Sequence, residues 1–322
     1  MILPVIAALI SLCVGRNSIS LPDVFKALTG SEEVAGSVRI TIQNIRVPRI
    51  LLGLLCGAGL SVAGCSFQSF FSNPLATPDT MGVAGGASFG AALGLLLGFN
   101  MIGVQILSLC MGLGAVAATR LAASGRSHGP AVLIISGIMV GSLFSALVSL
   151  VKFVADTESQ LPAITYWLMG SLGSAGYKNL AVGAPVIIIG IFIIFLLRWR
   201  MNLLSLSEDE LIASGTNVKL LRSLVVICAT AMTASTISMC GQVGWVGLIV
   251  PHMCRMIWGQ DSRKLIPASI CIGAAFMVVV DTVARSVSAA EIPVSILTAM
   301  IGAPFFILIL TTGKNRAGEG RM

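Results

Sequence analysis

Charged residues are scarce in this chain of 322 residues: they make up 10% of it, whereas 56% of the residues are hydrophobic and the mean hydropathy is +0.97. A soluble domain carries roughly 25% charged residues, because water must wet its surface. So few charges cannot cover a globule of this size. The composition therefore excludes an ordinary soluble domain and indicates a protein whose solvent is lipid.

Motifs that carry chemistry are missing as well. No GxxxxGK[ST] phosphate-binding loop occurs, so the chain is not expected to hydrolyse ATP unaided. The two histidines and eight cysteines form no CxxC or Cys/His cluster, so neither a metal site nor another cofactor is expected. The cysteines are interpreted as small buried hydrophobic residues. The sequence thus predicts that the protein is not an enzyme.

Long apolar runs bounded by charge, proline or glycine are what the sequence does contain. A spanning helix needs about 20 mostly apolar residues, because the hydrocarbon layer is about 30 Å thick. The predicted spans are 1–14, 50–70, 82–99, 102–123, 130–154, 181–197, 220–240, 244–258, 265–286 and 294–312. A further stretch at 161–173 is too short to span, and a re-entrant or interfacial position is expected. The predicted fold class is an all-α polytopic membrane protein, with about ten transmembrane helices in one bundle that forms a single domain over 1–322.

Ten spans place both termini on one side, which we expect to be the cytoplasm. Of the 20 lysines and arginines, twelve then lie inside and eight outside, in agreement with the positive-inside rule. The net charge of +7 therefore follows from topology, and no nucleic acid partner is expected. Five of the eight outer charges lie in one loop, 15–49, and this loop needs its own explanation.

Three stretches are unusual for a membrane protein. The polar turn at 73–78 interrupts the apolar sequence, and its two prolines, Pro74 and Pro78, cannot continue a helix. The segment 198–222 is the longest charged stretch between spans, and either a solvated linker or a docking element for a cytoplasmic partner is compatible with it. Asp281 and Arg285 are four residues apart near the outer end of their span, which is compatible with a mutual ion pair or with a surface-presented arginine.

Glycines recur at four-residue spacing inside the spans, for example Gly53 with Gly57 and Gly137 with Gly141. Small residues at this spacing line one helix face and let two backbones approach closely in lipid. We therefore expect these glycines to serve helix packing.

The longest of these unusual segments resemble a known family. RVPRILLGLLCGAGLSVAGCSFQSFFSNPLATPDTMGVAGGASFG, GQVGWVGLIVPHMCR and EIPVSILTAMIGAPFFILIL occur in the order found in FecCD permeases, and the resemblance runs from about 37 to 312. These are membrane subunits of ATP-binding cassette (ABC) importers for ferric siderophores, haem and cobalamin. The resemblance implies the type II importer fold in a bacterial inner membrane. It also implies two ATP-binding cassette ATPase subunits, a second permease subunit (homo- or heterodimer) and an extracytoplasmic substrate-binding protein as partners.

The resemblance also assigns site residues. Arg46, Arg49 and Arg285 match the arginines that receive acidic residues of the binding protein, which would explain the basic loop. Asn73, Pro74 and Leu75 match an element of the cytoplasmic gate. The matches to the ATPase-coupling helices are Leu206, Ser207, Glu208, Asp209, Leu211, Ala213, Ser214 and Gly215. Ser207 and Ser214 replace the Gly and Leu usual in the family, so the docking geometry there is less closely implied.

The function expected from this resemblance is import of a ferric siderophore by alternating access, with haem or cobalamin as the alternative cargo. An ion-coupled secondary transporter would carry buried acids at mid-span, whereas Asp281 is the only acid well inside a span and has Arg285 nearby.

Overall fold

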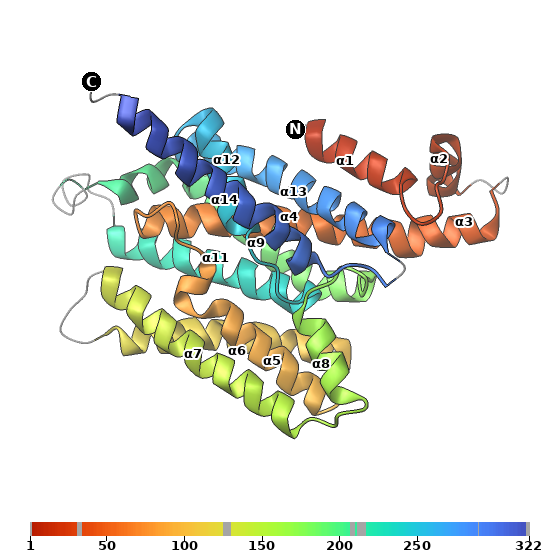
Figure 1. Ribbon diagram of the computed structural model, residues 1–322, viewed down its shortest axis with the longest axis horizontal. Coiled ribbons are helices and arrows are strands. Elements are labelled where there is room, and N and C mark those ends of the chain that lie inside the picture. Colours follow the sequence, from red (N-terminus) through yellow and green to blue (C-terminus); the bar gives the residue numbers. More distant parts are fainter. Residues whose placement is uncertain are drawn as a thin grey trace.

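The computed structural model describes residues 2–30, 34–124, 130–206, 210, 217–288 and 290–319. Its helices lie mostly along one long axis (Figure 1). They are α1 (Ile2–Cys13), α2 (Leu21–Thr29), α3 (Gly36–Ile40), η1 (Thr41–Arg46), α4 (Val47–Phe70), η2 (Pro78–Met81), α5 (Val83–Leu96), α6 (Met101–Ala122), α7 (Pro130–Val154), α8 (Gln160–Leu168), α9 (Tyr177–Met201), η3 (Asn202–Ser205), α11 (Val218–Cys240), α12 (Val246–Trp258), α13 (Ser262–Val287) and α14 (Val294–Glu319).

The ten predicted spans correspond to ten apolar helices in the described part of the chain. Six are long and apolar enough to cross a membrane, and four are shorter apolar helices: α1, α5, α12 and the 294–309 part of α14. The stretch at 161–173 contains the nine-residue α8, which is too short to span. The prediction of an all-α membrane bundle is confirmed.

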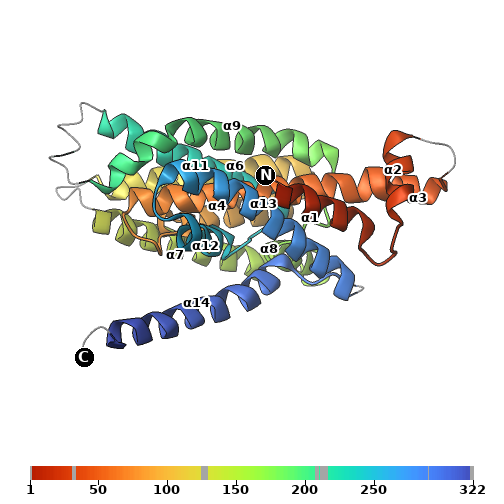
Figure 2. The same ribbon diagram turned by 90° about the horizontal axis from the view of Figure 1, so that it is seen from above.

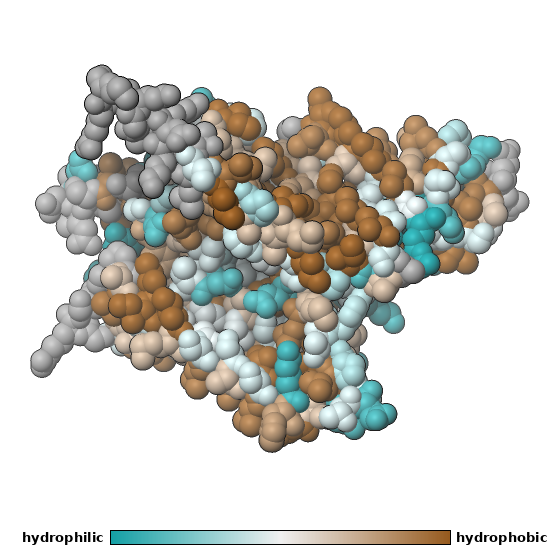
Figure 3. All heavy atoms as spheres, viewed as in Figure 1, coloured by the Kyte–Doolittle hydropathy of each residue, from teal (hydrophilic) through white to brown (hydrophobic). Residues whose placement is uncertain are grey.

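The bundle has a buried centre and an apolar outside. In the most apolar window of the helix that contains α4, 83% of the residues are buried, whereas in α7 only 11% are. In Figure 2, α14 runs along one side of the bundle, apart from most other helices. Apolar side chains cover much of the face in Figure 3, and a paler strip crosses it between α14 and α7. This distribution is the one expected of a protein embedded in lipid.

Glycines bring the helices into close contact, as their spacing predicts. A Cβ on Gly57 would lie 2.1 Å from the carbonyl oxygen of Gly273, and one on Gly137 would lie 1.9 Å from that of Thr80. Because real side chains cannot approach backbone so closely, only glycine permits α4 to pack on α13 and α7 to pack on η2.

The second span begins earlier than predicted. α3, η1 and α4 form one continuous helical stretch, Gly36–Phe70, whereas the sequence predicts a span from residue 50. Pro48 lacks an amide hydrogen, and its ring would collide with the preceding turn of a regular helix. The stretch just before it, Thr41–Arg46, is a π-helix, whose wider turns relieve that collision. Arg46 and Arg49 therefore lie within a helix.

Candidate functional site

Two ends of the bundle carry the candidate sites. We call the end at which α3 leads into α4 and α13 finishes the arginine end. We call the opposite end, where α9 finishes at Met201 and α11 begins at Val218, the coupling end.

The three predicted docking arginines form one cluster at the arginine end, and all three are buried, with 4–8% of their surface exposed. Arg49 binds Asp281 through Nε and Nη2 at 2.8–3.0 Å and Glu291 through Nη1 at 2.9 Å. The guanidinium of Arg49 thus holds two carboxylates from different segments. This arrangement is the bidentate geometry that arginine favours.

The other two arginines bind the N-terminal segment. Arg46 donates to the backbone oxygens of Leu12 and Asn17, and Arg285 donates to both oxygens of Ser11. Of the two arrangements compatible with the sequence, the ion pair of Asp281 and Arg285 is present, whereas Arg285 is buried and not presented at the surface. The pair is long, at 3.9 Å, so Asp281 is bound mainly by Arg49. The three arginines and Glu291 line a cavity of about 170 Å³, and the exposed Arg16 also lines it.

Sequence reasoning missed Glu291 and Arg16 as members of this cluster. Glu291 opens the EIPVSIL segment, and an acid directly before an apolar span is a signal that could have identified it. Arg16 was visible as one of the basic residues of the 15–49 loop. Their assembly could not be read from spacing, since Arg49 and Glu291 are 242 residues apart.

The broken helix is confirmed at the coupling end. α4 ends at Phe70, Ser72 has a positive φ of 49°, and the chain resumes as η2 only at Pro78. The amide of Leu75 donates to Oδ1 of Asn73 at 2.9 Å, which closes an Asx turn. The segment Ser72–Leu75 is exposed, so the predicted gate residues lie on the surface of the chain.

A groove of about 680 Å³ lies between α5 and α7, and Asp79 of η2 is among its lining residues. Small residues dominate its walls: Gly82, Ala84, Gly85, Ser88, Gly137, Gly141, Ser142 and Ser145. Among its lining residues the charged ones are Asp79 and Lys152, one of each sign.

The predicted coupling segment is described only in part. Leu206, directly after η3, is exposed at the coupling end. The other coupling residues, Ser207, Glu208, Asp209, Leu211, Ala213, Ser214 and Gly215, lie outside the described residues.

Comparison with known proteins identifies this architecture. Residues 3–312 match the FecCD transport family. The chain is 40% identical to the molybdate import system permease protein of Haemophilus influenzae, over 95% of this chain and 92% of the relative. It is 37% identical to the cobalamin import system permease protein of Halobacterium salinarum, over 88% of this chain and 77% of the relative.

A solved structure described as an inward-facing conformation of a metal-chelate type ABC transporter superposes with a TM-score of 0.88 at 39% identity, covering 97% of both chains. FecCD proteins are permease subunits, and the ATPase activity of their importers is in separate subunits. The chain therefore belongs to the FecCD transport family and is the membrane permease subunit of an ABC importer.

Proposed function

We propose that this permease imports a metal chelate, with ferric siderophore as the first candidate and haem or cobalamin as the alternatives. The observation that carries this proposal is the 680 Å³ groove, whose lining consists mostly of small residues. Sites of about 300–1,000 Å³ suit bulky small molecules. A small oxyanion such as molybdate would need converging cationic or donor groups, and Lys152 is the one cation among the described residues that line the groove.

The cargo is tested by uptake. Vesicles containing this permease with its ATPase and binding protein are given radiolabelled ferric siderophore, haem, cobalamin or molybdate, each with and without internal ATP. We expect ATP-dependent accumulation of a chelate. Accumulation of molybdate alone would refute the chelate assignment and leave the permease function intact.

The mechanism we propose is alternating access powered from the coupling end. ATP-driven closure of two ATPase subunits pushes on residues 205–218, and the turn at Asn73, Pro74 and Leu75 opens or closes the inner mouth of the groove. In this arrangement the protein lies in a bacterial inner membrane, and both of its termini face the cytoplasm. An ion-coupled alternative is disfavoured because Arg49 already neutralises Asp281. Uptake that survives ATP depletion would overturn the ATP-driven mechanism.

We further propose that an acidic side chain of the binding protein enters the 170 Å³ cavity at the arginine end. Buried Arg46, Arg49 and Arg285 line the cavity together with exposed Arg16. Charge pairs of this kind govern orientation and on-rate. This role is supported by the charges around the cavity: four arginines line it, and Glu291 is the one acid among its described lining residues.

Arg16→Glu tests docking without disturbing buried groups. We expect a slower association of the binding protein and little change in folding. Lys178→Glu is the matched control, since Lys178 is exposed and begins α9 but does not line the cavity. Equal effects of the two charge reversals would remove the assignment of docking to this cavity.

A further inference from the structure

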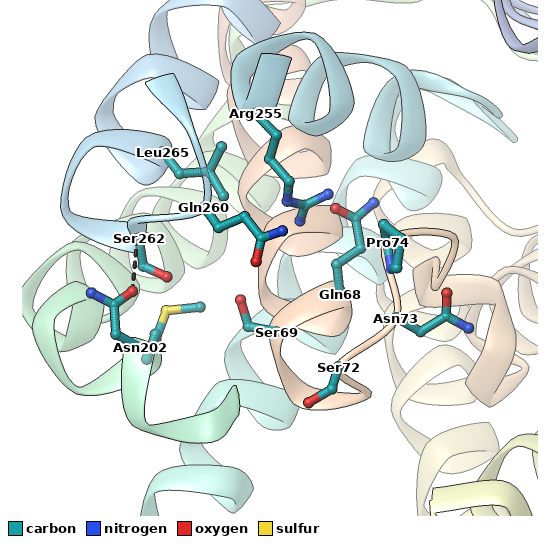
Figure 4. Close-up of a pocket in the computed structure, with 11 residues that line it drawn as sticks. Gln68, Ser69, Ser72, Asn73, Pro74, Asn202, Arg255, Gln260, Ser262 and Leu265 are labelled. Atoms are coloured by element: carbon teal, nitrogen blue, oxygen red, sulfur yellow. Dashed lines mark hydrogen bonds between the residues drawn. The ribbon is translucent and has the colours of Figure 1, made fainter. Parts of the chain in front are cut away.

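A second polar cavity lies at the coupling end, beside the turn proposed as the gate. It has a volume of about 210 Å³ and lies among the ends of α4, α9, α12 and α13. Figure 4 shows Arg255 reaching from α12 toward Gln68 of α4, with the amide of Gln260 and the hydroxyl of Ser69 facing the same space. The groups that converge there are one cation and several uncharged polar side chains.

Arg255 lacks a counter-charge in the described part of the chain. Its Nη1 is buried without a hydrogen-bond partner, and none of the ion pairs formed among described residues includes it. Arginine stays protonated in proteins, so this charge cannot be relieved by losing a proton. Arg255 as a whole is half-buried, and a cationic group shielded from water without a partner is unfavourable. The cavity therefore provides a positively charged site for an anion.

Gln68 narrows the chemistry of that anion. Only 3% of its surface is exposed, its Oε1 has no hydrogen-bond partner, and its Nε2 makes a long bond of 3.4 Å to Gly247. Figure 4 shows the amide oxygen on the side of Arg255. An anion that also carries a hydrogen-bond donor would satisfy both Arg255 and this acceptor. Hydrogen phosphate keeps such a proton near neutral pH, whereas sulfate does not.

The size of the cavity agrees with a small ligand. At roughly 30 Å³ for each water, 210 Å³ corresponds to about seven waters, enough for a tetrahedral oxyanion with part of its hydration shell. We propose that this cavity is a binding site for hydrogen phosphate, held by Arg255, Ser69, Gln260 and Gln68.

The position of the site suggests what occupancy would do. Its walls include Asn73 and Pro74 on one side and Met201 and Asn202, at the end of α9, on the other. Ser72 Oγ donates to Leu204 O at 3.4 Å across the same junction. A bound phosphate would therefore lie between the turn after α4 and the end of α9.

Calorimetric titration of the purified full-length chain in detergent, with inorganic phosphate at constant ionic strength, tests the proposal. We expect saturable binding, at least tenfold tighter for phosphate than for sulfate, and at least tenfold weaker phosphate binding in Arg255→Gln. Arg200→Gln is the matched control, because Arg200 is exposed at the same end and does not line the cavity. We expect this variant to bind phosphate with an affinity within twofold of that of the unsubstituted protein. Equal affinity in Arg255→Gln and Arg200→Gln refutes the site, as does absence of saturable binding.

A surface variant keeps the test valid if Arg255→Gln fails to fold. Gln260 is exposed, so Gln260→Glu is expected to fold while placing a negative charge at the cavity wall and weakening phosphate binding at least tenfold. Unchanged binding in this variant overturns the proposal.

A lipid phosphomonoester is the other source of the same chemistry. Repeating the titration in nanodiscs with and without phosphatidic acid distinguishes the sources, since a lipid ligand would compete with free phosphate. Competition that disappears in Gln260→Glu assigns the site to the lipid phosphate, whereas phosphate affinity independent of the lipid assigns it to the free ion.

Discussion

Removing one carboxylate from the buried cluster at the arginine end is expected to destabilise the whole bundle. The side chains of Arg49 and Asp281 are only 6% and 3% exposed, and their contacts of 2.8–3.0 Å join α4 to α13. Breaking a buried pair by removing one partner costs about 3–5 kcal/mol, because the other charge is left uncompensated. Since Arg49 keeps Glu291, we expect Asp281→Asn to lie near the lower limit, about 3 kcal/mol.

Equilibrium unfolding in mixed micelles of mild detergent and dodecyl sulfate, followed by tryptophan fluorescence, measures this loss. Glu291→Gln is the matched control, because the Glu291 side chain is 30% exposed and its pair with Arg49 is expected to contribute about 1 kcal/mol or less. The double variant Arg49→Met, Asp281→Leu is expected to recover only part of the loss. It removes both charges of the pair, but Glu291 loses Arg49 and Arg285 loses Asp281. An Asp281→Asn variant as stable as Glu291→Gln would refute the reasoning.

Three further predictions follow from local geometry. Gly57→Ala is expected to destabilise the bundle by up to about 3 kcal/mol through overpacking and to lower the yield of folded protein in size-exclusion assays. Gly114 has open space around it, so Gly114→Ala is expected to leave that yield unchanged. The guanidinium of Arg263 and the amide of Asn202 hold the pKa of the Asp261 carboxyl well below its usual range. This carboxylate therefore stabilises the fold above its ordinary pKa of about 3.9, and melting curves of Asp261→Asn and the original protein should converge as pH falls below that value, not as it rises. Asn73→Ala removes the Asx-turn bond, about 1 kcal/mol, and is expected to lower ATP-dependent uptake several-fold at unchanged yield.

Much of the fold was predictable because a helix that crosses the hydrocarbon layer must be apolar over about 20 residues. Apolar length locates the spans, and the prolines at 74 and 78 locate the break, since neither property depends on distant partners. The start of the second span was misplaced because charges at Arg46 and Arg49 suggested a loop. Their partners on α1 and α13 and at Glu291 make a helical, buried position possible.

The sites were less predictable because they depend on contacts between distant segments. A four-residue spacing suggested that Asp281 pairs with Arg285, but the shorter contact is to Arg49, 232 residues away. The cavity around Arg255 also assembles from four helix ends, and no single sequence window contains it. The docking, gate and coupling roles stay predictions that the proposed experiments test.

The ion pair between Arg49 and Asp281 has a consequence for biosynthesis. During translation α4 emerges with its arginine well before α13 exists, and synthesis of the intervening 232 residues takes roughly 10–50 s at 5–20 residues per second. For that interval Arg49 has to stay hydrated at the membrane surface or be shielded by an insertion factor. Ribosomes stalled before residue 281 should therefore leave α4 shallow in the bilayer and accessible to water-soluble labels, and completion of α13 should withdraw it.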